Sequence, residues 1–427
     1  MIRDIRFAFA CEILQYPCIW MCIHRDGSNA EIKMTIGDSF TLNPSSAVLT
    51  PDAPGLRVLV DGVRRGTSIL ASQSKKHPIE LQDTDRQWLI CESSGTIGRP
   101  KAIRRRPETW IKSFDINAER YGLSPADTYA TFGSLGHSLT LFATIEALSL
   151  GADICSLDKM APRRQVQHLA DSAVTVIYAT PTQLTLLVKS TVATKRSALP
   201  SVQHIFSGGG KLGDEVRDAL CSLFPAASIH EFFGASETSF ITISDANTPA
   251  GSVGLPYPEV SVRIGDSAGT APNETGEIWV SSPYLFDGYN SDTTDGITRS
   301  GAYLSVGDMG YLNAEGYLFL RGRKDRMVTV ADKNVFPEEI EAFIGQMKGV
   351  DLCAVLSVPD QTRGNRLVCF VKTTSTGLSP TTIRNHCRTH LSSHAVPKEV
   401  YCSDAMPVLR SGKPDLRALY AGLGSGR

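Results

Sequence analysis

The stretch "VTVIYATPTQLTLLVKST", residues 174–191, decides the fold. Its first seven residues are mostly β-branched, aromatic or apolar, which is typical of a short buried strand. From Pro181 onward the apolar residues recur three or four positions apart, which predicts a helix. A strand that is followed at once by a helix is the repeating unit of a wound α/β sheet.

The same alternation runs from about residue 85 to residue 240. Further strands are predicted at 87–93, 127–133, 151–157, 203–209 and 228–234, and further helices at 141–151, 163–172 and 214–224. At about 250–320 the chain becomes rich in Gly, Asn and Asp with short strands, which predicts a small β-subdomain. After "RGRKDRMVTV" (321–330) a compact α+β unit follows.

We therefore expect an α/β protein of two domains, because 427 residues exceed one ordinary core. A large N-terminal domain, 1–322, contains the wound sheets and the small β-subdomain. A small, mobile α+β C-terminal domain, 323–427, follows a hinge near 323–326.

Composition limits the partners and the compartment. Lys plus Arg total 43 against 44 Asp plus Glu, so no bulk charge attracts nucleic acid or an anionic membrane, and neither partner is expected. The ten cysteines form no CxxC pair, which favours a reduced, cytoplasmic compartment. The apolar N-terminal run 6–23 is interrupted by Glu12, Gln15 and Pro17, so neither export nor a membrane span is expected.

A Gly- and Ser-rich loop, "CESSGTIGRPKAIRRR" (91–106), follows the first strand of the alternating region. It is not a Walker loop, because Pro100 precedes Lys101 and Ala102 follows it. Hydroxyls, backbone N–H groups and a lysine nevertheless suit a polyphosphate better than a plain surface turn. The candidate phosphate-binding residues are Ser93, Ser94, Gly95, Thr96, Gly98 and Lys101. The three arginines at 104–106 are predicted to be solvated, with contact to a phosphate of ATP or of a thiol donor as the alternative.

Four more stretches follow in order: "SGGG" (207–210), "EFFGASETS" (231–239), "GDMGYLNAEGYLFLRGRKD" (307–325) and "PVLRSGKPDLR" (407–417). With the loop, they resemble the successive motifs of the adenylate-forming (ANL) superfamily of acyl-CoA synthetases, aryl acid ligases and peptide-synthetase adenylation domains. The resemblance covers roughly residues 85–420. It implies activation of a carboxylic acid by ATP and Mg²⁺ as an acyl adenylate, and then transfer to the thiol of CoA or of a free-standing phosphopantetheinyl carrier protein.

The resemblance also implies roles for single residues. The phosphate loop would hold the β- and γ-phosphates, Ser236 would contact the α-phosphate, and Glu237 would ligate Mg²⁺, which prefers oxygen ligands. Lys413 would reach both the carboxylate and the α-phosphoryl oxygens and stabilise the developing charge. Asp325 would be the hinge residue of a domain alternation.

The nucleoside and the acid have candidate residues as well. Phe233 would stack on adenine, Glu231 would accept from its amino group, and Asp308 with Arg323 would bind the ribose. The glycines that would let these groups approach the backbone are Gly208, Gly209, Gly210 and Gly234. Ser134, His137 and Gly208 would line the acid pocket. No aspartate in "FGSLGHSLTLF" (132–142) is available to pair with an α-ammonium, so an acyl or aryl acid is expected rather than an α-amino acid.

Several departures keep alternatives open. Ile97 stands where a loop threonine is usual, which removes a phosphate donor, and Asp332 stands where a glycine of a turn is usual. Residues 1–85 carry none of the usual upstream signatures, so that part is expected to be abbreviated, with an open acid pocket or a homodimer as consequences. Adenylate formation without thiol transfer, or a degenerate nucleotide-binding protein, are the alternative functions.

A group of side chains near the C-terminus has the spacing of metal ligands. It consists of His386, Cys387, His390 and His394. An ordinary amphipathic helix is the expected explanation, because the family commonly has one at this place.

Overall fold

The computed structural model describes residues 37–50, 53–73, 76–93, 101–194, 198–265, 270–290, 296–375, 377–409 and 412–424. The predicted wound sheet has seven strands in the order β11-β10-β9-β8-β7-β5-β6. Strands β5 to β9 pair parallel with one another, whereas β10 pairs antiparallel with both β9 and β11. The strands are β5 (Thr128–Thr131), β6 (Asp153–Ser156), β7 (Val176–Ala179), β8 (His204–Gly208), β9 (Ser228–Ala235), β10 (Ser239–Ile243) and β11 (Leu255–Pro256).

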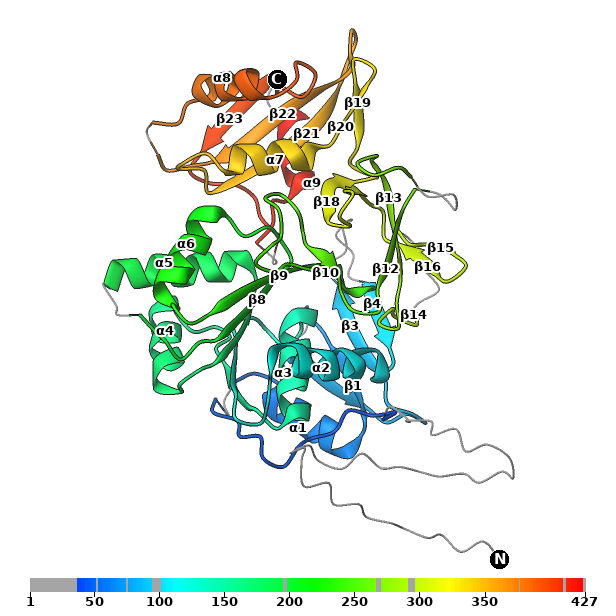
Figure 1. Cartoon of the computed structure of the whole chain (residues 1–427). Helices are drawn as coiled ribbons and strands as arrows, with labels where there is room; N and C mark the ends of the chain where they lie inside the picture. The colour runs from blue at the N-terminus through cyan, green and yellow to red at the C-terminus, as the bar shows by residue number, and fades with distance from the viewer. Residues whose placement is uncertain are drawn as a thin grey trace, which may run out of the picture.

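Helices cover both faces of this sheet (Figure 1). On one face lie α4 (Pro162–Asp171), α5 (Pro181–Thr194) and α6 (Asp214–Leu223). On the other lie α2 (Glu108–Tyr121) and α3 (Ser138–Leu150). The strand and helix predicted at 174–191 are therefore confirmed as β7 and α5.

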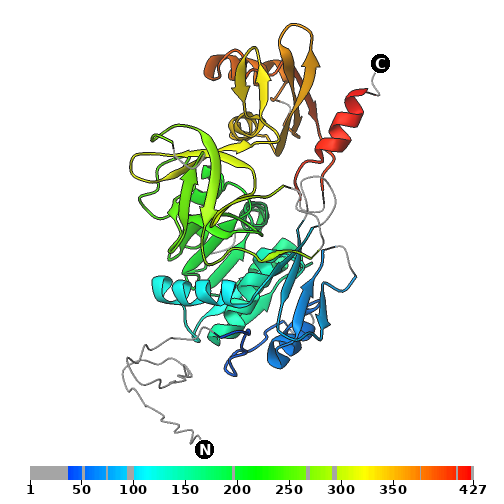
Figure 2. The ribbon, with the colours of Figure 1, turned by 90° about the vertical axis from the view of Figure 1, so that its right-hand side faces the viewer.

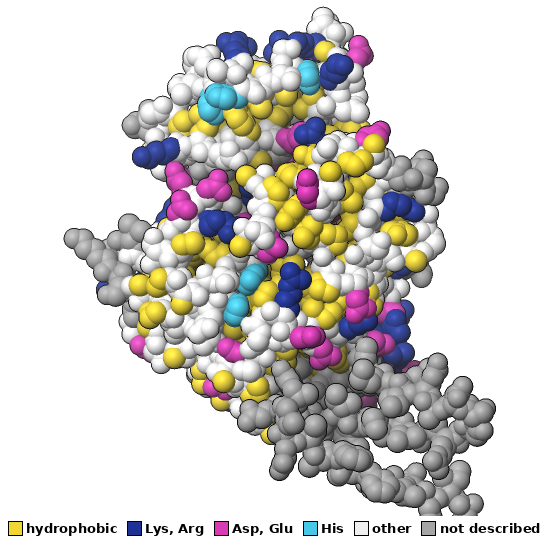
Figure 3. Space-filling model, viewed as in Figure 1, with side chains coloured by type: hydrophobic (Ala, Val, Ile, Leu, Met, Phe, Trp, Pro, Cys, Tyr) yellow, Lys and Arg dark blue, Asp and Glu magenta, His cyan; other side chains and the backbone are white. Residues whose placement is uncertain are grey.

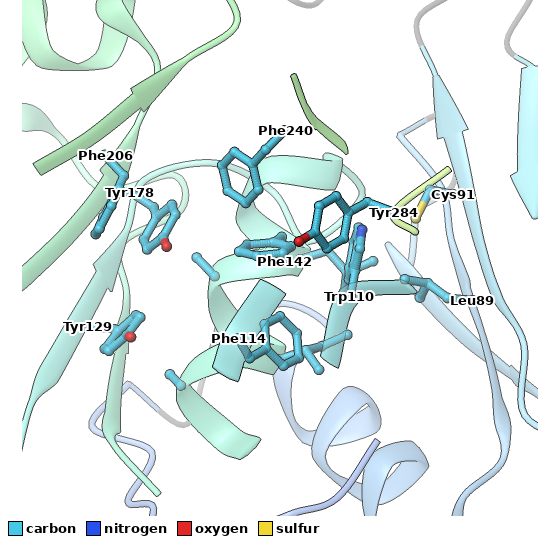
Figure 4. Packing of buried hydrophobic residues seen from close by; sticks show 14 of the residues in the cluster. Leu89, Cys91, Trp110, Phe114, Tyr129, Phe142, Tyr178, Phe206, Phe240 and Tyr284 are labelled. Carbon is cyan, nitrogen blue, oxygen red and sulfur yellow. The ribbon is translucent and has the colours of Figure 1, made fainter. Parts of the chain in front are cut away.

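A second sheet lies on the far side of α2 and α3, in the order β14-β4-β3-β1-β2. Its elements, with the helix that packs beside it, are α1 (Leu56–Arg65), β1 (Ser68–Ala71), β2 (Ile79–Gln82), β3 (Leu89–Ser93), β4 (Lys101–Arg105) and β14 (Gly288–Tyr289). Figure 4 shows the aromatic core between the two sheets, with Phe142 of α3 at its centre. Its ring meets those of Trp110, Phe114 and Phe240 edge-on at 5.1–5.2 Å between centroids. One core thus fixes both sheets around α2 and α3.

The predicted β-rich region forms a third sheet in the order β15-β16-β13-β17-β18, with β12 paired to β13. The strands are β12 (Ser261–Ile264), β13 (Gly276–Ser281), β15 (Thr298–Ser300), β16 (Tyr303–Ser305), β17 (Asp308–Leu312) and β18 (Leu318–Arg323).

The C-terminal α+β unit lies next to β18 of the third sheet (Figures 1 and 2) and has its own hydrophobic clusters. Its elements are β19 (Val328–Val330), β20 (Lys333–Val335), α7 (Pro337–Gly345), β21 (Leu352–Asp360), β22 (Gly364–Lys372), α8 (Pro380–His390), β23 (Glu399–Ser403) and α9 (Leu416–Gly424). The predicted fold class is confirmed, whereas the boundary at 322/323 and the mobility of the unit stay predictions.

The turn between β19 and β20 explains one departure of the sequence. Ala331 and Asp332 link the paired residues Val330 and Lys333, and their φ angles are 48° and 60°. Two left-handed residues in a two-residue hairpin loop are typical of a type I′ turn, in which aspartate is well tolerated. Asp332 therefore adopts the geometry that a glycine would supply.

No helix of the described ranges is long and apolar enough to cross a membrane. On the face shown in Figure 3, basic and acidic side chains are interspersed.

Candidate adenylation site

Glu237 lies on the tight turn that joins β9 to β10. The two strands pair antiparallel, with Ala235 opposite Ser239. A Cβ atom on Gly234 would lie 1.9 Å from the backbone oxygen of Ser239, so only glycine fits there. The Thr238 hydroxyl accepts a hydrogen bond of 3.0 Å from the Ala235 N–H and closes the turn. The motif "EFFGASETS" thus folds so that Ser236 and Glu237 project from a fixed loop.

The Glu237 carboxylate is connected to the start of β4 through a tyrosine. The Tyr289 hydroxyl donates a hydrogen bond of 3.0 Å to Oε1 of Glu237. The Nζ atom of Lys101 lies 5.3 Å from the centroid of the Tyr289 ring, a cation–π contact. Because β14 pairs with β4, with Tyr289 opposite Ile103, the lysine that ends the phosphate loop lies beside the candidate magnesium ligand. Sequence reasoning missed Tyr289.

Ser236 faces the beginning of α3. Its hydroxyl lies 3.0 Å from that of Ser138, the first residue of the helix. His137 precedes this residue, and burial lowers its pKa, opposed by the carboxylate of Asp158. The Ser134 carbonyl accepts from the His137 N–H at 2.9 Å, so both predicted acid-pocket residues belong to one tight loop before α3.

The predicted solvation of the three arginines is wrong for Arg105. Its side chain is 1% exposed, and its guanidinium donates to the backbone oxygen of Ser236. The neighbouring Arg104 lies over the Trp88 ring at 4.6 Å, and Arg106 donates to Asp287 at 2.8 Å. Burial also excludes direct contact of Arg105 with a phosphate.

Asp308 and Arg323 lie opposite each other on β17 and β18. Arg323 donates a hydrogen bond of 3.3 Å to Oδ1 of Asp308. Burial raises the pKa of Asp308, Arg323 counteracts this, and the negative charges of Glu237 and Asp325 raise it further. The candidate ribose and magnesium carboxylates therefore lie close enough to influence each other. Asp325 itself is exposed, 3.6 Å from Nε of Arg323.

The glycine motif after β8 borders an aromatic ring. Gly208 is buried, and a Cβ atom there would lie 2.2 Å from Cζ of Phe232. Gly209 has a φ of 86°, and both it and Gly210 are exposed. Phe233, the candidate adenine-stacking residue, is half-buried on β9.

Glu231 has protein partners in the structure. Its Oε2 accepts a hydrogen bond of 2.9 Å from the Leu212 N–H, and its Oε1 accepts from Arg217 of α6. These contacts attach the loop after the glycine motif to β9. A role toward the adenine amino group stays a prediction.

The structure gives fewer contacts for the remaining predicted residues, which belong to the phosphate loop and to the segment around Lys413. Residues 94–100, with Ser94, Gly95, Thr96, Ile97 and Gly98, lie outside the described residues, and of Ser93 the structure describes only the backbone at the end of β3. Lys413 is exposed, and its carbonyl accepts from the Leu409 N–H at 2.8 Å. The segment before α9 descends toward the N-terminal domain (Figures 1 and 2), but no described hydrogen bond or ion pair joins the Lys413 side chain to the other site residues.

No group of three or more His, Cys, Asp or Glu side chains in the described part of the chain is arranged to hold a metal ion. On α8, Cys387 is buried in the hydrophobic core, and the His386 ring stacks on Phe343 at 4.8 Å. The predicted amphipathic helix is present as α8, which carries His386, Cys387 and His390, whereas His394 lies beyond its end.

Comparison with known proteins agrees with this geometry. Residues 28–290 match the AMP-binding enzyme family and residues 339–413 match the C-terminal domain of AMP-binding enzymes. The chain is 30% identical to an uncharacterized acyl–CoA ligase of Bacillus subtilis over 393 residues, which cover 90% of this chain and 77% of that protein. It is 31% identical to a putative long chain fatty acid–CoA ligase of Staphylococcus epidermidis over 325 residues, 75% of this chain and 68% of that protein.

A solved structure has the same fold. It is the o-succinylbenzoate CoA synthetase of Bacillus subtilis in complex with an acyl-adenylate intermediate. The TM-score is 0.70 at 21% identity, over 90% of this chain and 83% of that one. With motifs, fold and family matches in agreement, the chain belongs to the AMP-binding enzyme family of the adenylate-forming superfamily and is an enzyme of the AMP-forming acid–thiol ligase type.

Proposed function

We propose that this enzyme joins ATP to a compact carboxylic acid, acyl or aryl, and passes the acyl group from the adenylate to the thiol of CoA. The observation that carries the proposal is the convergence of Glu237, Tyr289 and Lys101 beside Asp308. Two carboxylates and one ammonium next to the end of the phosphate loop suit a magnesium nucleotide.

The donor set suits Mg²⁺ held mainly by substrate. Mg²⁺ usually keeps several waters and binds through one or two carboxylates together with substrate phosphates. Glu237 supplies one such carboxylate, and its described hydrogen-bonding partner, the Tyr289 hydroxyl, occupies only one of its oxygens. Bound Mg²⁺ would neutralise charge as pyrophosphate leaves.

The protein groups then have separate tasks. Ser236 would donate to the α-phosphate, and Asp308 would accept from the ribose hydroxyls. Lys413 would reach the carboxylate and the α-phosphate from the C-terminal unit and offset their repulsion. Attack of a carboxylate oxygen on the α-phosphorus releases pyrophosphate, and attack of the CoA thiolate on the acyl carbon then releases AMP.

A compact acid is favoured by the packing behind Gly208. Phe232 lies against the place where a side chain on Gly208 would be, and its ring meets Phe240 edge-on at 4.8 Å. Phe232 is half-buried whereas Phe240 is 4% exposed, so Phe232 lies between Gly208 and a filled aromatic core. A closely packed core leaves no room for a long chain in that direction.

Mass spectrometry of the products tests the proposal. The enzyme is incubated with MgATP, CoA and single acids, and AMP and acyl-CoA should appear together for a short acyl or an aryl acid. The incubation is repeated with a phosphopantetheinyl carrier protein in place of CoA. If AMP and pyrophosphate are released but neither acceptor gains a thioester, an adenylate-forming enzyme that lacks thiol transfer would be favoured. Absence of any acid-dependent AMP would contradict the proposal.

A further inference from the structure

Arg105, the last residue of β4, is a charged side chain in the core. It is 1% exposed, and no described carboxylate lies within ion-pair distance of its guanidinium. A buried cation without a paired anion is costly to keep in a folded protein unless hydrogen bonds and nearby charges stabilise it. The position therefore needs an explanation beyond packing.

The hydrogen bonds of Arg105 converge on the turn that carries Glu237. Its Nη2 donates to the backbone oxygen of Ser236, and its Nη1 donates to the Ser239 hydroxyl at 2.7 Å. Nη1 also donates to the backbone oxygen of Tyr284 at 3.2 Å. One planar guanidinium thus contacts the residue before Glu237 and the residue two positions after it, which a lysine ammonium cannot reproduce with the same geometry.

The positive charge of Arg105 also interacts with the Glu237 carboxylate. Burial lowers the pKa of Arg105 to about 10, while the carboxylates of Glu237 and Asp287 oppose that shift. The guanidinium therefore stays protonated at neutral pH. Glu237 is one of the acids that compensate it without touching it.

We propose that Arg105 is a positioning residue that fixes the turn from Ser236 to Ser239 and thereby aims the Glu237 carboxylate at the magnesium ion of the bound nucleotide. The inference rests on the proposed function in one respect, the assignment of Glu237 to Mg²⁺. It replaces the alternative in which this arginine touches a phosphate, because the buried side chain is hydrogen-bonded to the turn itself, at the Ser236 backbone oxygen and the Ser239 hydroxyl.

The test compares Arg105→Met and Arg105→Lys with Arg104→Met as a matched control, since Arg104 is the neighbouring arginine and lies half-buried over the Trp88 ring, without a described hydrogen bond from its side chain to the turn. The first readout is amide hydrogen exchange of residues 235–240 in the free protein. The second is calorimetric titration with ATP, in the presence of Mg²⁺ and in the presence of EDTA.

Arg105→Met should raise the exchange rates of the turn and weaken MgATP binding by about tenfold, because buried acceptors lose a charged donor. The affinity of Arg105→Met for metal-free ATP should change little. Arg105→Lys should give exchange rates and an MgATP affinity between those of Arg105→Met and the wild type. Arg104→Met should match the wild type in both readouts. If Arg105→Met fails to fold, Arg105→Lys, which keeps the charge, should still show the selective loss with Mg²⁺.

Exchange rates and MgATP affinity that equal those of Arg104→Met would overturn the inference. An equal loss of affinity with and without Mg²⁺ would also overturn it, since the turn would then serve the fold rather than Glu237. A wild type that binds MgATP but shows no acid-dependent AMP formation would contradict the proposed function alone. A wild type that binds no MgATP would contradict both.

Discussion

The Tyr289 hydroxyl donates a hydrogen bond of 3.0 Å to Oε1 of Glu237, across the junction of the wound sheet and the second sheet. Tyr289→Phe keeps the ring beside Lys101 but removes this donor. Because a hydrogen bond to a charged group contributes about 1.5–3 kcal/mol, the Mg²⁺ concentration for half-maximal activity should rise by about tenfold or more. A magnesium titration of acid-dependent AMP formation measures this, with Tyr303→Phe in the β-subdomain as the control. An unchanged requirement would show that Tyr289 does not orient Glu237.

Asp308→Asn should weaken ATP binding because the amide cannot accept hydrogen bonds on both atoms. The KM for ATP should rise by about tenfold or more, with a smaller effect on the KM for the acid. Burial raises the pKa of Asp308 above its ordinary value of 3.8. When the pH is lowered, Asp308 should therefore become protonated, and the wild type should lose ATP affinity, at a higher pH than an exposed aspartate would allow. Glu315→Gln, an exposed carboxylate in the turn between β17 and β18, is the control. Equal ATP affinity in both variants would remove Asp308 from the nucleotide site.

Phe232→Ala should widen the range of acids. Removing the ring opens space behind Gly208, so longer or bulkier acids should gain activity relative to short ones. Rates across a series of acids of increasing length measure the shift, with Phe319→Ala, a ring on β18, as the control. The double variant Gly208→Ala/Phe232→Ala should recover activity that Gly208→Ala loses, because the added methyl group would meet the ring at 2.2 Å. A long-chain preference already present in the wild type would contradict the compact-acid assignment.

Much of the fold could be predicted from local patterns. Residues 174–191 and the alternating segments around them gave β5 to β9 and α3 to α6, because buried parallel strands are short apolar runs and their helices have a regular apolar period. The helices α1 and α2 and the strand β4 were missed. Their sequences mix charged and apolar residues, and their burial depends on partners that are distant in the chain.

The site was only partly predictable for a similar reason. Ser236, Glu237 and Asp308 could be named as candidates because they lie in contiguous motifs. Tyr289 and Arg105 could not, because their contacts with the Ser236–Ser239 turn arise from the pairing of β14 with β4 and from burial under a turn more than a hundred residues away. The available signal for Arg105 was its position two residues after Ile103, which places both side chains on one face of a strand.

The buried Glu146 makes folding stability depend on pH. Burial raises its pKa from 4.5 to about 7, while hydrogen bonds from Asn117 and Tyr178 counteract this. Between these pH values the folded protein holds a proton that the unfolded chain has released. The contribution of Glu146 to the free energy of unfolding should therefore fall by about 3 kcal/mol as the pH rises from about 4.5 to 7.

Denaturant unfolding of the wild type and of Glu146→Gln at several pH values gives the free energy of unfolding as a function of pH. The difference between the slopes of the two curves measures the contribution of Glu146. Glu119→Gln, which changes an exposed carboxylate of α2, should leave the slope as it is. Identical pH dependence in the wild type and Glu146→Gln would mean that Glu146 stays ionised in the core.

Acid-dependent exchange of pyrophosphate into ATP tests most directly whether this chain forms an acyl adenylate. The measurement uses a panel of aryl, short-chain and medium-chain acids with Mg²⁺, and compares the wild type with Lys413→Ala and with Lys398→Ala, an exposed lysine of the same unit. We predict exchange with one class of compact acids, loss of that exchange in Lys413→Ala, and its retention in Lys398→Ala. Binding of MgATP without exchange for any acid, or equal exchange in Lys413→Ala and the wild type, would contradict the account.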